Sequence, residues 1–509
     1  MKSIKKFTLG LLLSTTIMST LVGCGGTDVS GPRTDVKIAI NGEPTSLHAG
    51  LASSTLSKFI GLQVFDALIY KNEATGEYEP GLATEWVYED DTTMVFTLRE
   101  GVKFHNGDPV TAEDVKFTID KVIEEGYATP VIGFIDSVEI RDDKTIAVNY
   151  LFPYGPALEC FSQSTLGIMP KAVYEQDPDA FERNPIGSGP YKFTEWKTGT
   201  SIYLTANEEY WGNKAQIPHV EFVIYNNSAS TAALALENGE LDVITTVASV
   251  DNKRLSETEG LFFDETAGSG VTFVKFNVTE NSFFNDENLR LAVAHGIDKD
   301  AVILGAVEGY GTKAITNVPS YCYGVDQGYE PPQYDPEKAK EYLAKAGYPD
   351  GFDIVVPASS ADNYLVPLEI IQGQLSEIGI NIEIEKMDNN AWFEDVFRAG
   401  NYDMQMCSFS TAIADIDYYS AMYTTGGGNN FTGISIPELD ESYLKAKSTV
   451  DQEARLEPIF DTVQYLGDHA IIVPLFQTNK AICATDKLEG VFATADGAFD
   501  VSKISWATE

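Results

Sequence analysis

The stretch that most constrains the fold is residues 96–117, FTLREGVKFHNGDPVTAEDVKF. Apolar residues alternate with polar or small ones over residues 94–98, which is the period of a half-buried strand. Residues 106–107, Asn-Gly, favour a tight turn because both tolerate positive φ. Thr111 is a suitable N-cap for a helix that Gly126 would end. The stretch predicts strand, turn and capped helix, and it contains no catalytic constellation.

Length and charge narrow the class of protein. The chain has 509 residues, and a prior of roughly 150 residues per domain suggests about three domains. Its 35 basic and 76 acidic residues give a formal charge of −41. Such acidity argues against nucleic acid or an anionic lipid surface as the main partner. The acidic residues are typical of a solvated surface, and attraction of cationic solutes is the alternative interpretation.

The N-terminus has the pattern of an export signal. Three lysines precede residues 7–18, an apolar run too short to span a bilayer comfortably. Residues 21–24, Leu-Val-Gly-Cys, resemble the lipobox of bacterial lipoproteins. We therefore expect residues 1–23 to be a signal peptide, Cys24 to be lipidated, and residues 24–33 to be a linker. The alternative is an ordinary signal peptide followed by a free or disulfide-bonded Cys24.

The other cysteines and the histidines give no metal-site pattern. The four remaining cysteines lie far apart and form no CxxC pair, so a zinc or iron–sulfur site is not expected. They are interpreted as buried free thiols, although an exported protein could pair them. The chain has five histidines, and none falls in the segment 407–431 where a nickel ligand would be expected. We predict no metal site and no cofactor.

The C-terminal half has an α/β pattern. Residues 335–347 and 368–379 each show apolar residues at helical spacing and each end at a glycine. Isoleucines then alternate over residues 380–384, as in a strand. Helix, glycine and strand in succession predict an α/β lobe.

Several phrases together resemble the family of extracellular solute-binding proteins that serve peptide and nickel ABC importers. The similarity extends from about residue 38 to residue 475. The phrases, in chain order, are PGLATEW at 80–86, GVKFHNG at 101–107, TAEDV at 111–115, NPIGSGPYKFTEW at 184–196, ANEEYWG at 206–212 and ALALENGELDV at 233–243.

The resemblance implies an α/β, two-lobed periplasmic-binding-protein-like fold, with an extra domain on the first lobe and a hinge of two crossing segments. By analogy, lobe I comprises residues 34–67, 187–272 and 487–509. The extra domain comprises residues 68–186, and lobe II comprises residues 273–486. The strand at Val271 and the segment 479–486 would be the hinge crossings.

The resemblance also implies the function. The protein would capture a solute, most simply a peptide, between its lobes and deliver it to ABC permease subunits without making or breaking a bond. It would be a monomer, lipid-anchored to the outer face of the bacterial cytoplasmic membrane, at the cell surface or in the periplasm. An oligosaccharide or a metal complex is the alternative solute, and a peptide sensor or chaperone would use the same cleft.

A secreted hydrolase is the alternative from another class. Ser188 lies in a Gly-Ser-Gly segment, but the G-x-S-x-G frame of a nucleophile elbow is absent. A glycosidase needs a pair of carboxylates across a cleft, and the number of acidic residues leaves this alternative open. We predict no catalytic residue.

The expected ligand-binding residues follow from the resemblance. Relatives that bind dipeptides place an aspartate where this chain has Ala412, and they carry an arginine in a region where this chain has none between Arg290 and Arg398. Both departures favour a longer peptide, held by backbone hydrogen bonds, over a free dipeptide. Asp415 is expected to contact the solute, or alternatively to cap a helix that starts near Tyr418. The full predicted set is Ser53, Ser54, Phe409, Thr411, Asp415, Asp417, Tyr418 and Asn430.

Overall fold

The computed structural model describes residues 33–508 except 49, 51–53, 73–74, 127–128, 227, 326 and 411–412. Residues 34–509 form one compact unit. The predicted signal peptide and the lipidation site Cys24 lie outside the described residues. Within the described part of the chain, no helix has both the length and the apolar character that crossing a membrane requires.

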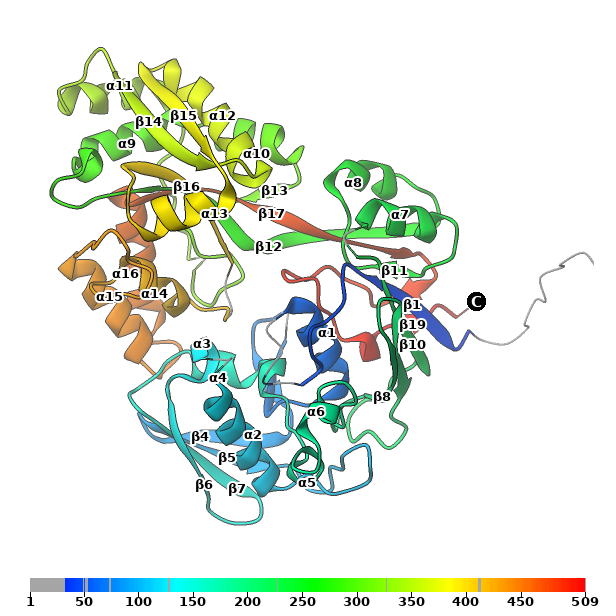
Figure 1. Ribbon diagram of the computed structural model, residues 1–509. Helices are drawn as coiled ribbons and strands as arrows, with labels where there is room; N and C mark the ends of the chain where they lie inside the picture. The colour runs from blue at the N-terminus through cyan, green and yellow to red at the C-terminus, as the bar shows by residue number, and fades with distance from the viewer. Residues whose placement is uncertain are drawn as a thin grey trace, which may run out of the picture. The chain divides into compact units, whose positions relative to one another are not determined.

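A nine-stranded mixed sheet connects the two lobes (Figure 1). Its first strand, β1, pairs in parallel with β10 and β11, and the other pairings are antiparallel. In spatial order the strands are β16 (Met404–Ser410), β12 (Leu261–Phe276), β17 (Ile472–Thr485), β11 (Val243–Ile244), β1 (Asp35–Ile40), β10 (His219–Ile224), β9 (Ser201–Ala206) and β8 (Tyr191–Lys197), with β13 (Gly311–Lys313) beside β17.

The two longest strands, β12 and β17, are the crossing segments of the predicted hinge (Figure 1). Their register shifts between Ala267 and Val271. At this irregularity the buried side chain of Gln477 donates a hydrogen bond to the carbonyl oxygen of Gly268 at 2.7 Å. A Cβ added to Gly268 would lie 2.5 Å from the carbonyl oxygen of Thr478, so the close approach of the two strands requires glycine there. The two-lobed fold with two crossing segments is confirmed.

The strand, turn and helix predicted from residues 96–117 are present. Strand β5 (Thr93–Leu98) lies inside a four-stranded antiparallel sheet, and helix α2 (Ala112–Glu125) begins after Thr111. Thr111 and Asp114 form a reciprocal capping box, and Gly126 ends the helix at φ 71°. The sheet also contains β4 (Ala83–Asp90), β6 (Ile135–Ile140) and β7 (Thr145–Tyr150), while β2 (Ile69–Lys71) pairs with β3 (Tyr78–Pro80).

The α/β pattern predicted for the C-terminal half is also present. Helix α11 (Pro336–Lys345) is capped by Asp335, and α12 (Asp362–Ser376) is followed by β15 (Ile380–Met387). Strand β15 pairs in parallel with β14 (Phe352–Ser359). The remaining longer helices are α1 (Thr55–Val64), α7 (Ala229–Glu237), α8 (Ser249–Ser256), α9 (Glu287–Gly296), α10 (Lys299–Val307), α14 (Asp417–Tyr423), α15 (Pro437–Ser448) and α16 (Leu456–Asp468). The shorter ones include α3 (Thr129–Ile132), α4 (Ala157–Phe161), α5 (Lys171–Tyr174), α6 (Pro178–Phe181) and α13 (Asn389–Trp392).

The Gly-Ser-Gly segment has a structural role. A Cβ on Gly187 would lie 2.0 Å from the carbonyl oxygen of Val64, and one on Gly189 would lie 2.8 Å from the same atom. Ser188 is completely buried, so its hydroxyl is not presented to a substrate. The His105 ring accepts a hydrogen bond from the Gly187 N–H through Nδ1 and faces the Gly189 carbonyl through Nε2. The segment therefore contacts the region of the Asn-Gly turn through His105 on one side and the C-terminal end of α1 on the other.

The four cysteines of the described chain are buried free thiols: Cys160, Cys322, Cys407 and Cys483. Burial raises the pKa of each thiol. The thiolate form that reacts or binds metal is therefore disfavoured at these positions.

Candidate functional site

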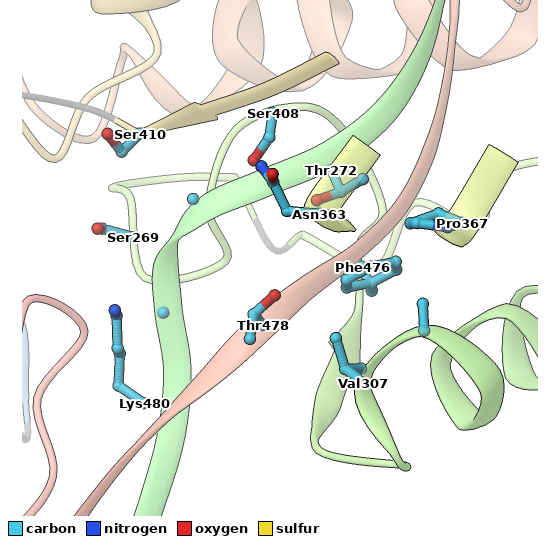
Figure 2. Close-up of a pocket in the computed structure, with 13 residues that line it drawn as sticks. Ser269, Thr272, Val307, Asn363, Pro367, Ser408, Ser410, Phe476, Thr478 and Lys480 are labelled. Carbon is cyan, nitrogen blue, oxygen red and sulfur yellow. The ribbon is translucent and has the colours of Figure 1, made fainter. Parts of the chain in front are cut away.

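Three neighbouring cavities are lined by residues from different parts of the chain. The first, here the hinge cavity, has a volume of about 320 Å³. It lies where β12 bends, and Figure 2 shows Ser269, Ser410 and Lys480 around that bend. Asn363 at the start of α12 and Val307 at the end of α10 complete the wall shown there. Both crossing strands therefore contribute to this cavity.

The second, here the α1 cavity, has a volume of about 280 Å³ and is the most polar of the three. Most of its lining residues come from α1, β2, α4 and the residues after it, from the end of β16 and the residues after it, and from the segment 494–498. Its charged lining residues are Lys58, Lys71, Glu159 and Asp496. Lys71 and Glu159 form an ion pair of 2.8 Å whose side chains are 16% and 5% exposed.

The third, here the aromatic cavity, has a volume of about 400 Å³. Phe134, Phe152 and Tyr154 line it from the segment 134–154, and Asp417 and Tyr418 line it from the start of α14. Lys447 lies 3.6 Å from the Asp417 carboxylate and 5.2 Å from the centre of the Phe152 ring. Burial raises the pKa of Asp417, although the charge of Lys447 partly opposes that shift.

The cavities adjoin one another. Ser269 and Ser410 line both the hinge cavity and the α1 cavity, and Ile413 lines both the α1 cavity and the aromatic cavity. We refer to the three cavities together as the interlobe groove. Such a concave site, with polar groups on walls from two lobes, can surround an extended solute.

The end of β16 supplies a second feature of the groove. Strand β16 is the terminal strand of the nine-stranded sheet, and no other described strand pairs with its outer edge. Ser408 and Ser410 at its end line the hinge cavity, and Ser410 is exposed. A strand edge of this kind offers backbone N–H and C=O groups to an extended peptide.

The structure brings two of the sequence-predicted residues into the groove, namely Asp417 and Tyr418. Ser53 and Thr411 lie outside the described residues. Ser54 is the N-cap of α1, and its hydroxyl accepts a hydrogen bond from the Ser57 N–H at 3.1 Å.

The other predicted residues have partners inside lobe II. The Phe409 ring packs 5.6 Å from the ring of Phe397. The Asn430 side-chain amide bonds the backbone of Thr424 and Ile434 and so holds its own loop. These contacts give both residues a packing or loop-closing role.

Asp415 is 1% exposed, and both of its carboxylate oxygens pair with the guanidinium of Arg455. Both of its oxygens lie 2.9 Å from Nη2 of that arginine. One oxygen also accepts a hydrogen bond from the N–H of Asp417, the first residue of α14. Because both oxygens of Asp415 have partners inside the protein, we do not include Asp415 in the proposed binding site.

Sequence reasoning missed Lys58, Glu159, Ser269 and Ser410, all of which line the groove. One signal was present for Lys58, because it is the only charged residue in α1, TLSKFIGLQV. A single lysine in an otherwise uncharged amphipathic helix requires either exposure or a partner. Glu159 and the two serines gave no comparable signal, since each is brought to the groove by distant pairing.

Residues 77–431 match the family described as bacterial extracellular solute-binding proteins, family 5 middle. The chain belongs to this family. It is 27% identical to the oligopeptide-binding protein OppA of Bacillus subtilis over 537 aligned residues, which cover 96% of each chain. Members of the family are extracellular or periplasmic binding proteins, in agreement with the function expected from the sequence.

Solved structures show the same fold. HbpA2 from Haemophilus parasuis superposes with a TM-score of 0.86 at 24% identity, covering 93% of this chain and all of that one. The DppA protein of Helicobacter pylori, solved in complex with the peptide STSA, superposes with a TM-score of 0.71 at 26% identity, over 93% of this chain and 98% of that one. This family 5 protein is therefore a solute-binding protein of the two-lobed type.

Proposed function

We propose that this family 5 protein captures a peptide in the interlobe groove and delivers it to the permease of an ABC importer. The observation that carries the proposal is the exposed end of β16, which forms part of a groove with walls from both lobes. An extended peptide can form backbone hydrogen bonds with that edge whatever its sequence. The similarity to the oligopeptide-binding protein OppA, and to DppA solved with a bound peptide, supports the same class of solute.

Capture would proceed by movement of the lobes about β12 and β17, because these two strands are the crossings between them. Closure would exclude water from the solute and strengthen its polar contacts. The protein is proposed to bind without turnover. The division into lobe I, extra domain and lobe II at the residues given above belongs to the same proposal.

The lipobox-like residues 21–24 support attachment of the protein through Cys24 to the outer face of the cytoplasmic membrane. A diacylglyceryl group plus an N-acyl chain would give stable anchoring, where one chain alone is marginal. Radiolabelled palmitate should label the wild-type protein and not the Cys24→Ala variant. Equal labelling of both would refute the anchor. The protein is proposed to act as a monomer.

Native mass spectrometry of the purified protein tests the proposed function. The expected result is a complex whose released solute has the mass and fragmentation pattern of a peptide, recovered uncleaved after prolonged incubation. An oligosaccharide is the second candidate, because aromatic rings line one of the cavities and could stack on sugar rings. Release of a sugar instead of a peptide would replace the proposal, and steady cleavage of the peptide would refute binding without turnover.

A further inference from the structure

Lys58 is a partly buried cation on the wall of the α1 cavity. It lies in the first turn of α1, and its neighbours Phe59 and Ile60 are buried in a hydrophobic core. Among the described residues its ammonium forms no ion pair, and the charge of Asp496 opposes only part of the effect that burial has on its pKa. Within the described part of the chain, no ion pair therefore compensates the desolvation of this cation.

The other charged residues of the cavity are engaged or solvated. The Lys71 ammonium is neutralised by Glu159, which also accepts a hydrogen bond from the Tyr78 hydroxyl at 3.1 Å. Asp496 is exposed, and one of its oxygens accepts a hydrogen bond from the Ala498 N–H at 3.0 Å. Only Lys58 combines partial burial with the lack of a paired anion on this wall.

A cation in this situation gains most from an anion that arrives with the solute. Burial lowers the pKa of the Lys58 ammonium, which reports the free-energy cost of keeping its charge there. A bound carboxylate would offset that cost by a charge-assisted hydrogen bond. The chain also lacks any arginine between Arg290 and Arg398, so the second lobe supplies no guanidinium from that region for a solute carboxylate.

We propose that Lys58 binds a carboxylate of the captured peptide and so orients the peptide in the interlobe groove with that carboxylate against α1. This inference rests on the proposed peptide-binding function. The carboxylate can be the C-terminus of the peptide or an acidic side chain. In either case the site selects solutes with an anionic group at one end and tolerates variation along the β16 edge.

The test uses three pools of synthetic tetrapeptides: randomised uncharged sequences with free C-termini, the same sequences amidated, and amidated sequences with one glutamate. Each pool is equilibrated with the protein after unfolding and refolding to remove co-purified solute, and bound peptides are quantified by mass spectrometry. A charge-assisted hydrogen bond contributes about 1.5–3 kcal/mol, so the wild-type protein should prefer a carboxylate-bearing pool by about ten- to hundredfold. The preferred pool identifies the source of the carboxylate.

Lys58→Met should abolish that preference, and Lys58→Arg should retain it. Lys253→Met is the matched control, because Lys253 is exposed on α8, outside the three cavities, and its loss changes the net charge equally. Lys58→Met should melt no lower than the wild type, since it removes a poorly compensated charge. An undiminished preference in Lys58→Met, or an equal loss in Lys253→Met, would overturn the inference.

The role of Lys58 and the peptide-binding function are refuted by different results. If the wild-type protein retains all three pools equally, the role of Lys58 is refuted and peptide binding stands. If the wild-type protein retains no pool, the proposed function itself is refuted.

Discussion

The buried pair of Asp415 and Arg455 allows a quantitative test of a structural role against a ligand-binding role. Replacing Asp415 with asparagine keeps the shape of the side chain and an oxygen that can accept from the Asp417 N–H. It removes the negative charge that faces Arg455, whose side chain is 1% exposed. The substitution therefore leaves a buried guanidinium without its counter-ion.

The expected loss of stability follows from that geometry. Breaking a buried ion pair by removing one partner costs about 3–5 kcal/mol, because the remaining charge stays desolvated. Arg455 keeps its hydrogen bond from Nε to the Ala446 carbonyl at 2.7 Å, so its side chain cannot simply turn to solvent. Replacing both partners, as in Asp415→Leu with Arg455→Met, should recover a large part of the loss, since a hydrophobic pair carries no desolvation penalty.

Urea unfolding followed by tryptophan fluorescence measures this loss. Trp392 is the only tryptophan between residues 212 and 505, and it belongs to the same apolar core of lobe II as Tyr419. A Trp392→Phe background identifies the part of the signal that reports on this lobe. The matched control is Asp461→Asn on the exposed face of α16, which should change stability by less than about 0.5 kcal/mol.

Binding decides between the two roles. Calorimetric titration with the co-purified solute should give an affinity for Asp415→Asn close to that of the wild type at temperatures where both are folded. A variant that unfolds like the wild type but binds ten- to hundredfold more weakly would refute the structural role. Asp415 would then be a solute contact, which is the first of the two interpretations that the sequence left open.

Three further outcomes are expected. Gly187→Ala should lower stability by about 1–3 kcal/mol, because its Cβ would lie 2.0 Å from a backbone carbonyl oxygen at the end of α1. The control is Gly61→Ala within α1, where a Cβ meets nothing within 4 Å. Equal melting temperatures of the two variants would contradict this prediction. Burial lowers the pKa of His105 from 6.5 to about 4. As the pH drops, the unfolded chain therefore takes up the proton before the folded protein does, and stability should fall between about pH 6.5 and 4. In melting curves, His105→Gln should make this loss of stability smaller. An unchanged pH profile would show that His105 does not cause the loss. Gly268→Ala should alter lobe movement, because its Cβ would meet the facing strand β17 at 2.5 Å. X-ray scattering measures the movement as the decrease in radius of gyration that the solute induces. An unchanged decrease would show that the two crossing strands accommodate the added methyl group.

Features that depend on neighbours in sequence could be predicted. Thr111 and Asp114, which form the capping box, are three positions apart, and the glycine that ends α2 follows the helix directly. Hydrogen bonds and backbone preferences of this range are settled by the local chain, whatever the rest of the protein does. The succession of strand, turn and helix, and the α/β pattern of the C-terminal half, were predictable for the same reason.

The partners of charged side chains were not predictable in the same way. From the sequence, Asp415 was the preferred polar contact for the solute, with a helix cap as the alternative, and Asp417 was a further member of the predicted set. The structure pairs Asp415 with Arg455, forty positions later, and places Asp417 on the wall of the aromatic cavity. Which carboxylate is engaged depends on how α14 meets the segment that precedes α16, and no local pattern encodes that meeting.

The lysines of the α1 cavity show the same difference between what the local sequence determines and what distant segments determine. By itself, the sequence shows that Lys58 is the only charged residue of the segment 55–64, and it gives no indication of a partner for Lys71. Only the tertiary structure placed Glu159 against Lys71 and, among the described residues, left Lys58 without an ion pair. The physical reason is that local structure is fixed by backbone preferences over a few residues. The energy of a charge, in contrast, depends on the desolvation and counter-ions that distant segments bring to it.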